Sequence, residues 1–380
     1  LPAILSAVIL TFSKAIGTFG TINYLGSPVQ YYTLSSQLYM NINSRDTQTG
    51  FAMAILMIII ASIAVFVNQK LIGSRKSYAT IGGKGGRSTL IGLGKVGRPV
   101  ITAALFVFFA VGIIMPIVIL VMESFMLKEG IYSLDNFTLH YWIGESNPQI
   151  MEGLPGIFKN DEFINSLFNS LRLTLVNGVF GTIFGQLLGY ITAKGRGRLH
   201  GKLVEQLVFI PYLIPSVAFG GIYLSMFSQP QQIFGVTLVP ALYGTFALLT
   251  LVSVVKHLPF AARAGTSNML QISGELEEAA TIEGAGFFRR FVKIVFPLSK
   301  GGFISGFMLI FVSIMKELDL IILIMTPTTS TLPYLAFRYQ NGNSPQASDC
   351  VAIVMFSIVF LVYAIANLSG KADLAKSMAG

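Results

Sequence analysis

Long apolar runs alternate with short polar segments along most of this chain. Eight runs are long enough to cross a membrane, and they cover residues 3–25, 51–69, 100–122, 167–193, 203–227, 237–256, 301–325 and 350–368. A helix of about 20 apolar residues crosses the hydrocarbon core of a bilayer, and in lipid only helices and closed barrels satisfy every backbone polar group. The strands of a membrane barrel alternate in polarity, and these runs do not. The pattern therefore predicts an all-α polytopic membrane protein with about eight transmembrane helices.

Composition agrees with this fold class and narrows the chemistry. Of the 380 residues, 53% are hydrophobic and 11% are charged, whereas soluble domains carry about 25% charged residues. Cys350 is the single cysteine, so neither an intramolecular disulfide nor a thiolate metal cage is expected. His140, His200 and His257 lie on separate segments, which argues against a histidine metal site. We expect no metal and no cofactor.

The basic residues gather in alternate loops. They form three clusters: Lys70, Arg75, Lys76, Lys84, Arg87, Lys95 and Arg98; Lys194, Arg196, Arg198 and Lys202; and Lys256, Arg263, Arg289, Arg290, Lys293 and Lys300. Because Lys and Arg accumulate in cytoplasmic loops, the clusters place these three loops on the cytoplasmic side of the membrane that the apolar runs cross. The net charge of +9 then requires no nucleic-acid partner.

The beginning and the end of the chain resemble each other. Phe12–Pro28 aligns without gaps on Phe311–Pro327, and each segment is followed by a Thr-Leu pair, an Asn-rich turn and a final apolar run. We interpret this as a duplicated six-span unit. Residues 1–69 would be the last two spans of a first copy, 70–98 a basic cytoplasmic linker, 99–370 a complete second copy, and 371–380 a cytoplasmic tail. The chain begins inside an apolar run without Met, so the interpretation expects further spans upstream.

The linker contains two glycine-rich tracts that resemble nucleotide-binding motifs. Gly92–Gly97 matches G-x-G-x-x-G, but no strand pattern precedes it and an apolar run follows. Gly82–Thr89 lacks the G-x-x-x-x-G-K-[ST] spacing of a phosphate-binding loop. We therefore expect a flexible connector here and no ATP site.

The segment Glu277–Pro297, EEAATIEGAGFFRRFVKIVFP, is far longer and more charged than a turn between two spans requires. Ser273 is a candidate N-cap, and acids follow it in the first turns, where the helix dipole favours them. Gly284 and Gly286 are expected to break this helix, and the Phe-rich residues after them to form an interfacial helix. The segment thus predicts a short helix, a tight bend and a second helix beneath the membrane, suited to docking another protein. An ordinary amphipathic loop is the alternative.

This segment resembles the cytoplasmic loop of permease subunits of binding-protein-dependent type I ABC importers. That loop carries E-A-A-x-x-x-G, nine residues, and then I-x-L-P. The positions that match are Glu278, Ala279, Ala280, Gly284, Ile294 and Pro297, while Phe296 replaces the usual Leu. The resemblance covers essentially the whole chain and implies the type I importer permease fold.

The resemblance also implies roles and partners. Residues 257–300 would be the coupling loop, with Glu277 joining the six matched residues at the surface that meets an ATPase. The expected partners are two cytoplasmic ABC ATPase subunits and a periplasmic or lipid-anchored solute-binding protein. The chain itself would be a multi-pass transport subunit of a bacterial cytoplasmic (inner) membrane and not an enzyme.

Three further tracts look most similar to the duplicated ferric-iron permeases: Met315–Leu318, Asn169–Arg198 and Phe209–Gly221. The resemblance therefore implies ferric iron as the solute, with polyamines, thiamine, phosphonates or sulfate as alternatives. An ion-coupled secondary transporter is a further alternative, but inverted repeats are typical of that class, and here the two copies have the same orientation.

Lys316, Glu317 and Asp319 lie within an apolar run, where charges are costly and indicate a functional site by default. One hypothesis places them along the translocation pathway. The other makes them a structural ion pair with a neighbouring helix. Pro211 and Pro215 predict a kink in the run 203–227.

Overall fold

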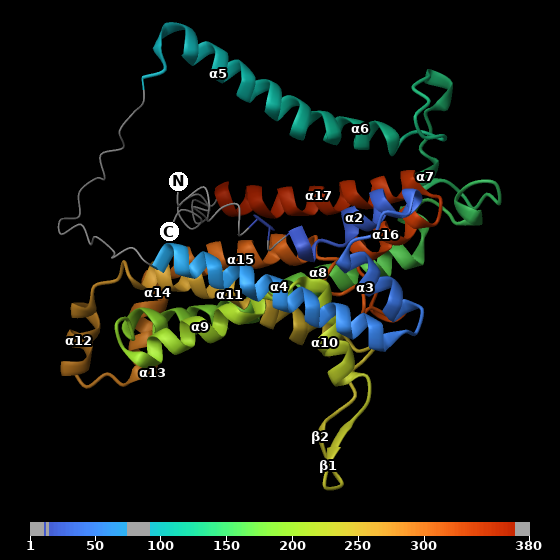
Figure 1. The fold of residues 1–380 in the computed structure, drawn as a ribbon. Helices are drawn as coiled ribbons and strands as arrows, with labels where there is room; N and C mark the ends of the chain where they lie inside the picture. Colours follow the sequence, from blue (N-terminus) through green and yellow to red (C-terminus); the bar gives the residue numbers. More distant parts are fainter. Residues whose placement is uncertain (1–10, 13–14, 74–91, 369–380) are drawn as a thin grey trace.

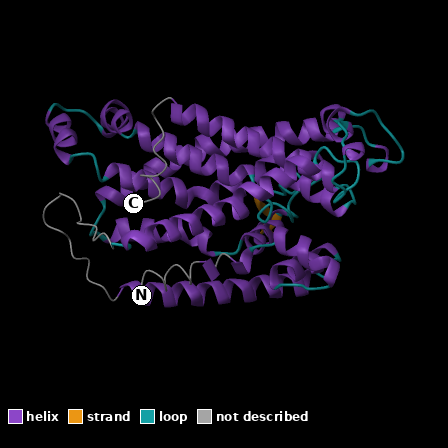
Figure 2. Ribbon diagram, turned by 90° about the horizontal axis from the view of Figure 1, so that it is seen from above, coloured by secondary structure: helices purple, strands orange, loops and turns teal. Residues whose placement is uncertain are grey.

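The computed structural model describes residues 11–12, 15–73 and 92–368, and its long helices run along a common direction (Figures 1 and 2). Residues 1–10 and 13–14 of the first expected span lie outside the described part of the chain, as does most of the linker. The first segment contains α2 (Gly20–Gly26), the 3₁₀ turn Ser27–Val29, α3 (Leu34–Asn43) and α4 (Thr47–Gly73).

After the linker, the helices follow in the order of the apolar runs. They are α5 (Gly94–Phe109), joined by a π-helical turn to α6 (Met115–Glu123); α7 (His140–Ile143); α8 (Asp161–Lys194); α9 (Leu199–Leu213); α10 (Ser216–Phe227); α11 (Phe246–Met269); α15 (Lys300–Met315); α16 (Leu332–Asn341); and α17 (Pro345–Leu368). Between α11 and α15 lie α12 (Gly274–Ile282), α13 (Phe287–Arg290) and α14 (Phe296–Leu298).

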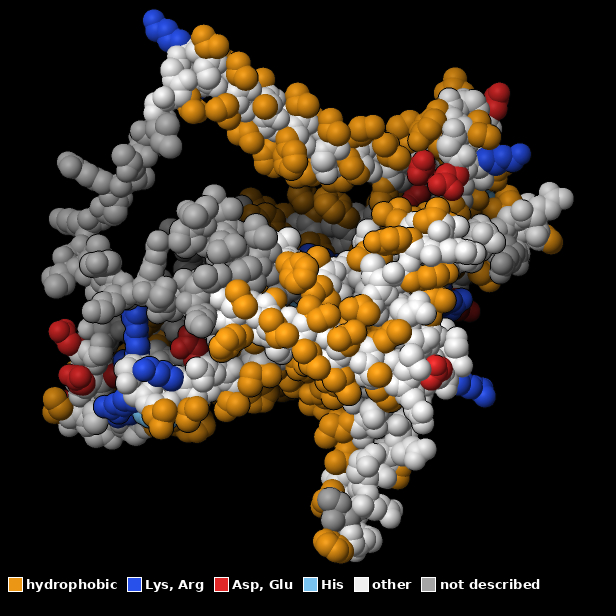
Figure 3. Space-filling model, in the orientation of Figure 1, with side chains coloured by type: hydrophobic (Ala, Val, Ile, Leu, Met, Phe, Trp, Pro, Cys, Tyr) orange, Lys and Arg blue, Asp and Glu red, His pale blue; other side chains and the backbone are white. Residues whose placement is uncertain are grey.

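The all-α membrane fold is confirmed. Within the described residues, five helices are long and apolar enough to cross a membrane, or up to seven if each of two bent helix pairs is one span. Helix α5 stands apart from the bundle, whereas α6, joined to it, contacts α17. Both display apolar side chains along their length (Figure 3). Such a surface is suited to lipid rather than to water.

In the described part of run 3–25, residues 18 and 19 interrupt the helix before α2. Three later expected spans also differ from continuous helices. Run 203–227 is divided into α9 and α10, which meet at 98°, so the kink expected from Pro211 and Pro215 is a full break. In run 237–256, the first residues belong to a hairpin of β1 (Gln231–Ile233) and β2 (Val236–Val239), and the helix α11 starts only at Phe246. The hairpin forms because Phe234 and Gly235 both take positive φ, as a tight two-residue turn requires.

The third difference lies at the end of α15. The helix ends at Met315, and the remaining residues of run 301–325 form turns instead of a continued helix. Glu317 contributes to this ending because its carboxylate accepts the backbone N–H of Leu320 at 3.0 Å and closes a local turn. The three charged residues of this run therefore lie on irregular backbone.

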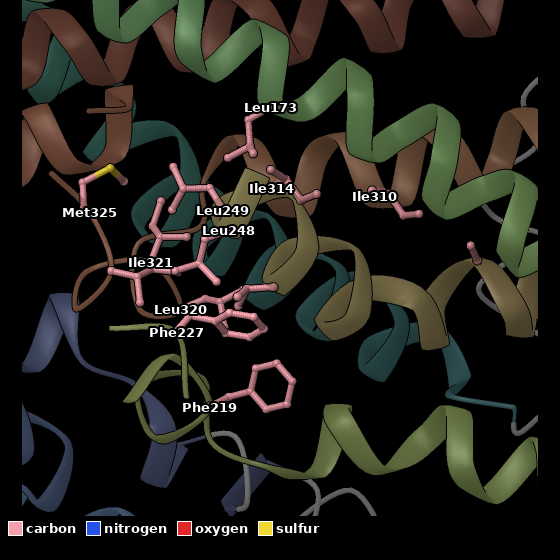
Figure 4. Packing of buried hydrophobic residues seen from close by; sticks show 13 residues of the cluster. Leu173, Phe219, Phe227, Leu248, Leu249, Ile310, Ile314, Leu320, Ile321 and Met325 are labelled. Atoms are coloured by element: carbon pink, nitrogen blue, oxygen red, sulfur yellow. The ribbon is translucent and has the colours of Figure 1, made fainter. Parts of the chain in front are cut away.

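Small residues allow α8 and α11 to approach closely. A Cβ at Gly185 would lie 2.3 Å from the Cβ of Ala261, and one at Gly189 would lie 2.6 Å from the carbonyl carbon of Gly265. Glycines at a four-residue spacing are typical of tightly packed membrane helices. Beside this contact, Leu173, Leu248 and Ile314 belong to a buried apolar cluster that also joins α10 to the turns after α15 (Figure 4).

The first and last segments carry the same elements in the same order. A threonine N-cap precedes a ten-residue helix in both, namely Thr33 before α3 and Thr331 before α16. Three residues then lead to the long helices α4 and α17, and the middle one has positive φ in each case, at Arg45 and Asn343. The division into two copies and a linker stays a prediction.

Candidate translocation cavity and coupling loop

A cavity of about 740 Å³ lies where the first segment meets the rest of the chain. Its walls come from residues 17–24, the break between α9 and α10, the middle of α11, the end of α15, and α16. Lys316, Glu317 and Asp319 all line it. The structure therefore brings the three predicted pathway residues together at one cavity, while their role in transport stays a prediction.

Glu317 is engaged on both carboxylate oxygens. Its Oε1 accepts the Leu320 N–H, and its Oε2 lies 3.4 Å from Nε2 of His257 on α11. The His257 side chain is buried, and its other ring nitrogen lies 2.9 Å from the carbonyl oxygen of Ser253. Glu317 thus ties the end of α15 to α11, and the pathway and structural-pair hypotheses both stay predictions.

Asp319 connects the last segment to the first. Its two carboxylate oxygens accept backbone N–H groups of Phe19, at 3.2 Å, and Gly20, at 3.0 Å. These donors stand at the start of α2, where N–H groups lack a partner within the helix. The Asp319 carboxylate therefore caps a helix that is far away in sequence.

Lys316 differs from its two neighbours. It is exposed within the cavity lining, and among the described residues it has no hydrogen bond or ion pair. Its ammonium group therefore has no polar protein partner within the described part of the chain.

Lys256 is a cavity residue that the sequence analysis misplaced. It was counted with the cytoplasmic basic residues, but it lies in α11, is only 7% exposed, and also lines the cavity. Its Nζ donates to the carbonyl oxygens of Pro211, at 2.9 Å, and of Ile214. In a continuous helix the Pro211 carbonyl would accept the N–H of residue 215, but Pro215 has none.

Lys256 therefore stabilises the break between α9 and α10 by satisfying carbonyls that the helix cannot. The sequence signal was a lysine directly after an apolar stretch, next to His257. The apolar run 237–256 ends at this lysine and so predicts a loop there, whereas α11 continues to Met269. Arg263 also belongs to α11 and lies over the Phe209 ring, 5.5 Å from its centroid.

The coupling loop has the three parts that the sequence predicted. Ser273 caps α12 by accepting the Glu275 N–H at 3.3 Å, a bend follows at Gly284, and α13, a π-helical turn and α14 lead to α15. In Figure 1, α12 and α13 project beyond the ends of the long helices. Gly284 has φ of +78°, where glycine is favoured, and the N–H groups of Gly284 and Ala285 bond back to α12 carbonyls, as in a glycine C-cap.

The two adjacent acids of α12 differ in burial. Glu277 is buried, and its carboxylate contacts Nζ of Lys194 at 2.6 Å and accepts the Tyr190 hydroxyl at 2.7 Å. Glu278 and Ala279 are exposed, whereas Ala280 is half-buried. Glu277 thus anchors the loop to the end of α8 and leaves Glu278 and Ala279, the next two residues, at the surface.

The second half of the loop is also fixed to its surroundings. Phe287 and Phe291 both contact the Tyr190 ring, and Nη1 of Arg290 donates to Oγ1 of Thr281 at 2.6 Å across the bend. Ile294 is half-buried and Pro297 is exposed. The seven predicted coupling residues therefore lie on one loop, and their contact with an ATPase stays a prediction.

Together, the bundle, the cavity and the loop define a polytopic membrane permease. The model of the family described as binding-protein-dependent transport system inner membrane component matches residues 181–372, about half of the chain, and the chain belongs to this family. The expected class and its multi-pass location in the inner membrane are thereby confirmed.

Several relatives are similar over different lengths. The ferric transport system permease protein FbpB of Actinobacillus pleuropneumoniae is 22% identical over 387 residues, covering 100% of this chain and 52% of the relative. The sulfate permease CysT of Synechocystis sp. is 26% identical over 53% of this chain and 71% of its own length. The molybdate/tungstate permease WtpB of Thermococcus kodakarensis is 28% identical over 53% of this chain and 76% of its own. This chain thus spans about half the length of the FbpB relative.

Among solved structures, a bacterial ABC transporter for the acidic polysaccharide alginate contains a similar chain. The TM-score is 0.56 at 16% identity, over 71% of this chain and 94% of that one. This similarity supports the importer permease fold.

Proposed function

We propose that this chain forms part of the translocation pathway of a type I ABC importer and transmits ATP hydrolysis in partner ATPases to solute uptake. The chain has the transport role, and the hydrolysis takes place in the partner subunits. The solute would be delivered by an external binding protein. The observation that carries this proposal is the E-A-A-x-x-x-G loop, anchored by Glu277 to α8 and presenting Glu278 and Ala279 outward.

The anchoring explains how force could pass from the loop to the cavity. Glu277 holds α12 against the end of α8, and α8 packs closely along α11 through Gly185 and Gly189. Helix α11 carries Lys256 and His257 into the cavity wall. A displacement of α12 by an ATPase would therefore reach the cavity through rigid, closely packed helices.

Ferric iron is the solute we propose from the sequence, and the match to FbpB along the whole chain supports it. The names of other relatives specify sulfate, molybdate or tungstate, and trehalose. The comparisons thus support the transporter class more strongly than any one solute.

The proposal is tested by uptake in cells that express this permease with its ATPase and binding protein. Gly284→Ala is expected to reduce uptake several-fold, because an alanine at φ of +78° strains the bend at a cost of about 1–3 kcal/mol. Gly286→Ala is the matched control: it lies in the same loop at φ of −66°, and a Cβ at either glycine meets no atom within 4 Å. Normal uptake and normal ATPase binding by Gly284→Ala would contradict the coupling role.

A further inference from the structure

The charged side chains of the cavity are not equally available to a solute. Four residues that carry formal charge line it, namely Lys256, Lys316, Glu317 and Asp319, together with His257. Most of these side chains form hydrogen bonds with backbone groups of the protein. A charged side chain without such a partner influences which solutes the cavity can attract.

Both carboxylates, of Glu317 and Asp319, already contact groups of the protein itself. Asp319 accepts two N–H groups from the start of α2, with one bond to each oxygen. Glu317 accepts the Leu320 N–H on one oxygen and contacts His257 with the other. Each of these oxygens keeps a second lone pair, but a cation bound there would compete with the hydrogen bonds that hold α2 and the end of α15 in place.

One of the two lysines, Lys256, also has partners within the protein. The ammonium group of Lys256 is buried and donates to two carbonyls at the break between α9 and α10. The side chains of Lys256 and His257 both come from α11, and His257 lies against Glu317.

Lys316 remains. It is exposed, lines the cavity, and has no polar partner among the described residues. The polar groups that share the lining with it include the hydroxyls of Thr21 and Ser313, which can donate hydrogen bonds to an anion. A free ammonium group in a partly enclosed site attracts anions and repels cations, because low-dielectric walls focus its field.

We propose that the cavity is an anion-selective site in which Lys316 meets the solute. The solute class is a small anion, either an oxyanion or an iron chelate of net negative charge, and a bare ferric cation lies outside it. The passage of such a solute through this cavity depends on the transport function proposed above. The electrostatic preference itself is a property of this chain and can be measured without transport.

The test compares two thiol reagents of similar size and opposite charge at one cavity cysteine. Thr21 is exposed in the lining, and Thr21→Cys is made in a Cys350→Ser background that removes the only native cysteine. The purified permease in nanodiscs is treated with an anionic sulfonatoethyl or a cationic trimethylammonioethyl methanethiosulfonate. Each rate is divided by the rate of the same reagent with free cysteine.

The anionic reagent is expected to be favoured by about fivefold, because the unpaired ammonium group attracts it and repels the cationic reagent, while the hydrogen-bonded carboxylates of Glu317 and Asp319 oppose this effect in part. Lys316→Gln should bring the ratio close to one, and Lys316→Arg should preserve it. Lys300→Gln is the control: Lys300 is an exposed lysine at the other end of α15, and its removal should leave the ratio unchanged.

A ratio that favours the cationic reagent, or one that Lys316→Gln leaves unchanged, would overturn the proposal. Absence of reaction at both Thr21→Cys and Ser313→Cys would also overturn it, because a closed cavity cannot select a solute. No ATPase or binding protein is present, so loss of the proposed transport function would leave this ratio unaffected. Conversely, a neutral cavity in a permease that still drives ATP-dependent uptake would refute the anion site alone.

Discussion

Asp319 is hydrogen-bonded to the backbone of Gly20, the residue that stands opposite it when Phe12–Pro28 is aligned on Phe311–Pro327. Tyr39 and Phe337 show the same relation. Each is the sixth residue of its ten-residue helix, and their rings meet edge to face at 6.3 Å. Equivalent residues contact one another where a two-fold axis passes between related segments. These contacts border the cavity, as expected if the two segments form facing walls of one pathway.

Asp319→Ala is expected to destabilise the contact between these segments. It leaves the Phe19 and Gly20 N–H groups without an acceptor, at a cost of about 1–3 kcal/mol for each group that stays buried. Asp319→Asn keeps one carbonyl acceptor and should lose less. Thermal unfolding of the purified permease measures this, with Glu129→Ala in an exposed loop as the control. Equal melting temperatures for Asp319→Ala and Glu129→Ala would contradict the capping role.

Lys256→Met is expected to loosen the break between α9 and α10. The methionine fills a similar volume but leaves the carbonyls of Pro211 and Ile214 unsatisfied, so we expect a loss of about 2–4 kcal/mol in stability. Lys316→Met removes an unpaired ammonium group and should have little effect on stability. Melting temperatures in the same detergent give the comparison. A larger loss for Lys316→Met would reverse the assignment of the two lysines.

The sequence predicted the parts of this fold that depend on local pattern. Apolar run length located α4, α8 and α17, and cap and glycine signals located the bend at Gly284. The contacts of Lys256 and Asp319 could not be predicted from the sequence. Their partners lie 42 or more residues away, and these contacts depend on how the helices pack. The hairpin before α11 was missed because its valines and leucine read equally well as part of an apolar span.

The membrane orientation predicts which exposed positions react from outside. Val236, at the tip of the hairpin, and Lys293, in the coupling loop, are both exposed and lie in connections at opposite ends of α11. In a Cys350→Ser background, Val236→Cys should react with a membrane-impermeant maleimide in intact cells. Lys293→Cys should react only after the membrane is permeabilised. The reverse pattern would invert the positive-inside assignment of the basic loops.

The ion pair between Glu277 and Lys194 should carry more of the coupling than the exposed acid beside it. Glu277 is buried between Lys194 and Tyr190, so Glu277→Gln weakens the contact of α12 with α8. Glu278 is exposed, and Glu278→Gln is expected to affect ATPase binding without loosening the loop.

A double-mutant cycle separates these roles. Residues in direct contact show interaction energies of about 0.5–3 kcal/mol, so Lys194→Met and Glu277→Gln together should cost less stability than the sum of the single changes. Lys194→Met combined with Glu278→Gln should be additive, which makes that pair the matched control. The measurements are thermal stability of the permease and solute-stimulated ATPase activity of the assembled transporter. Additive losses for Lys194 and Glu277 would mean that α12 is held to the membrane domain by the aromatic contacts of Tyr190 instead, and the Tyr190→Leu variant would then show the larger loss of ATPase stimulation.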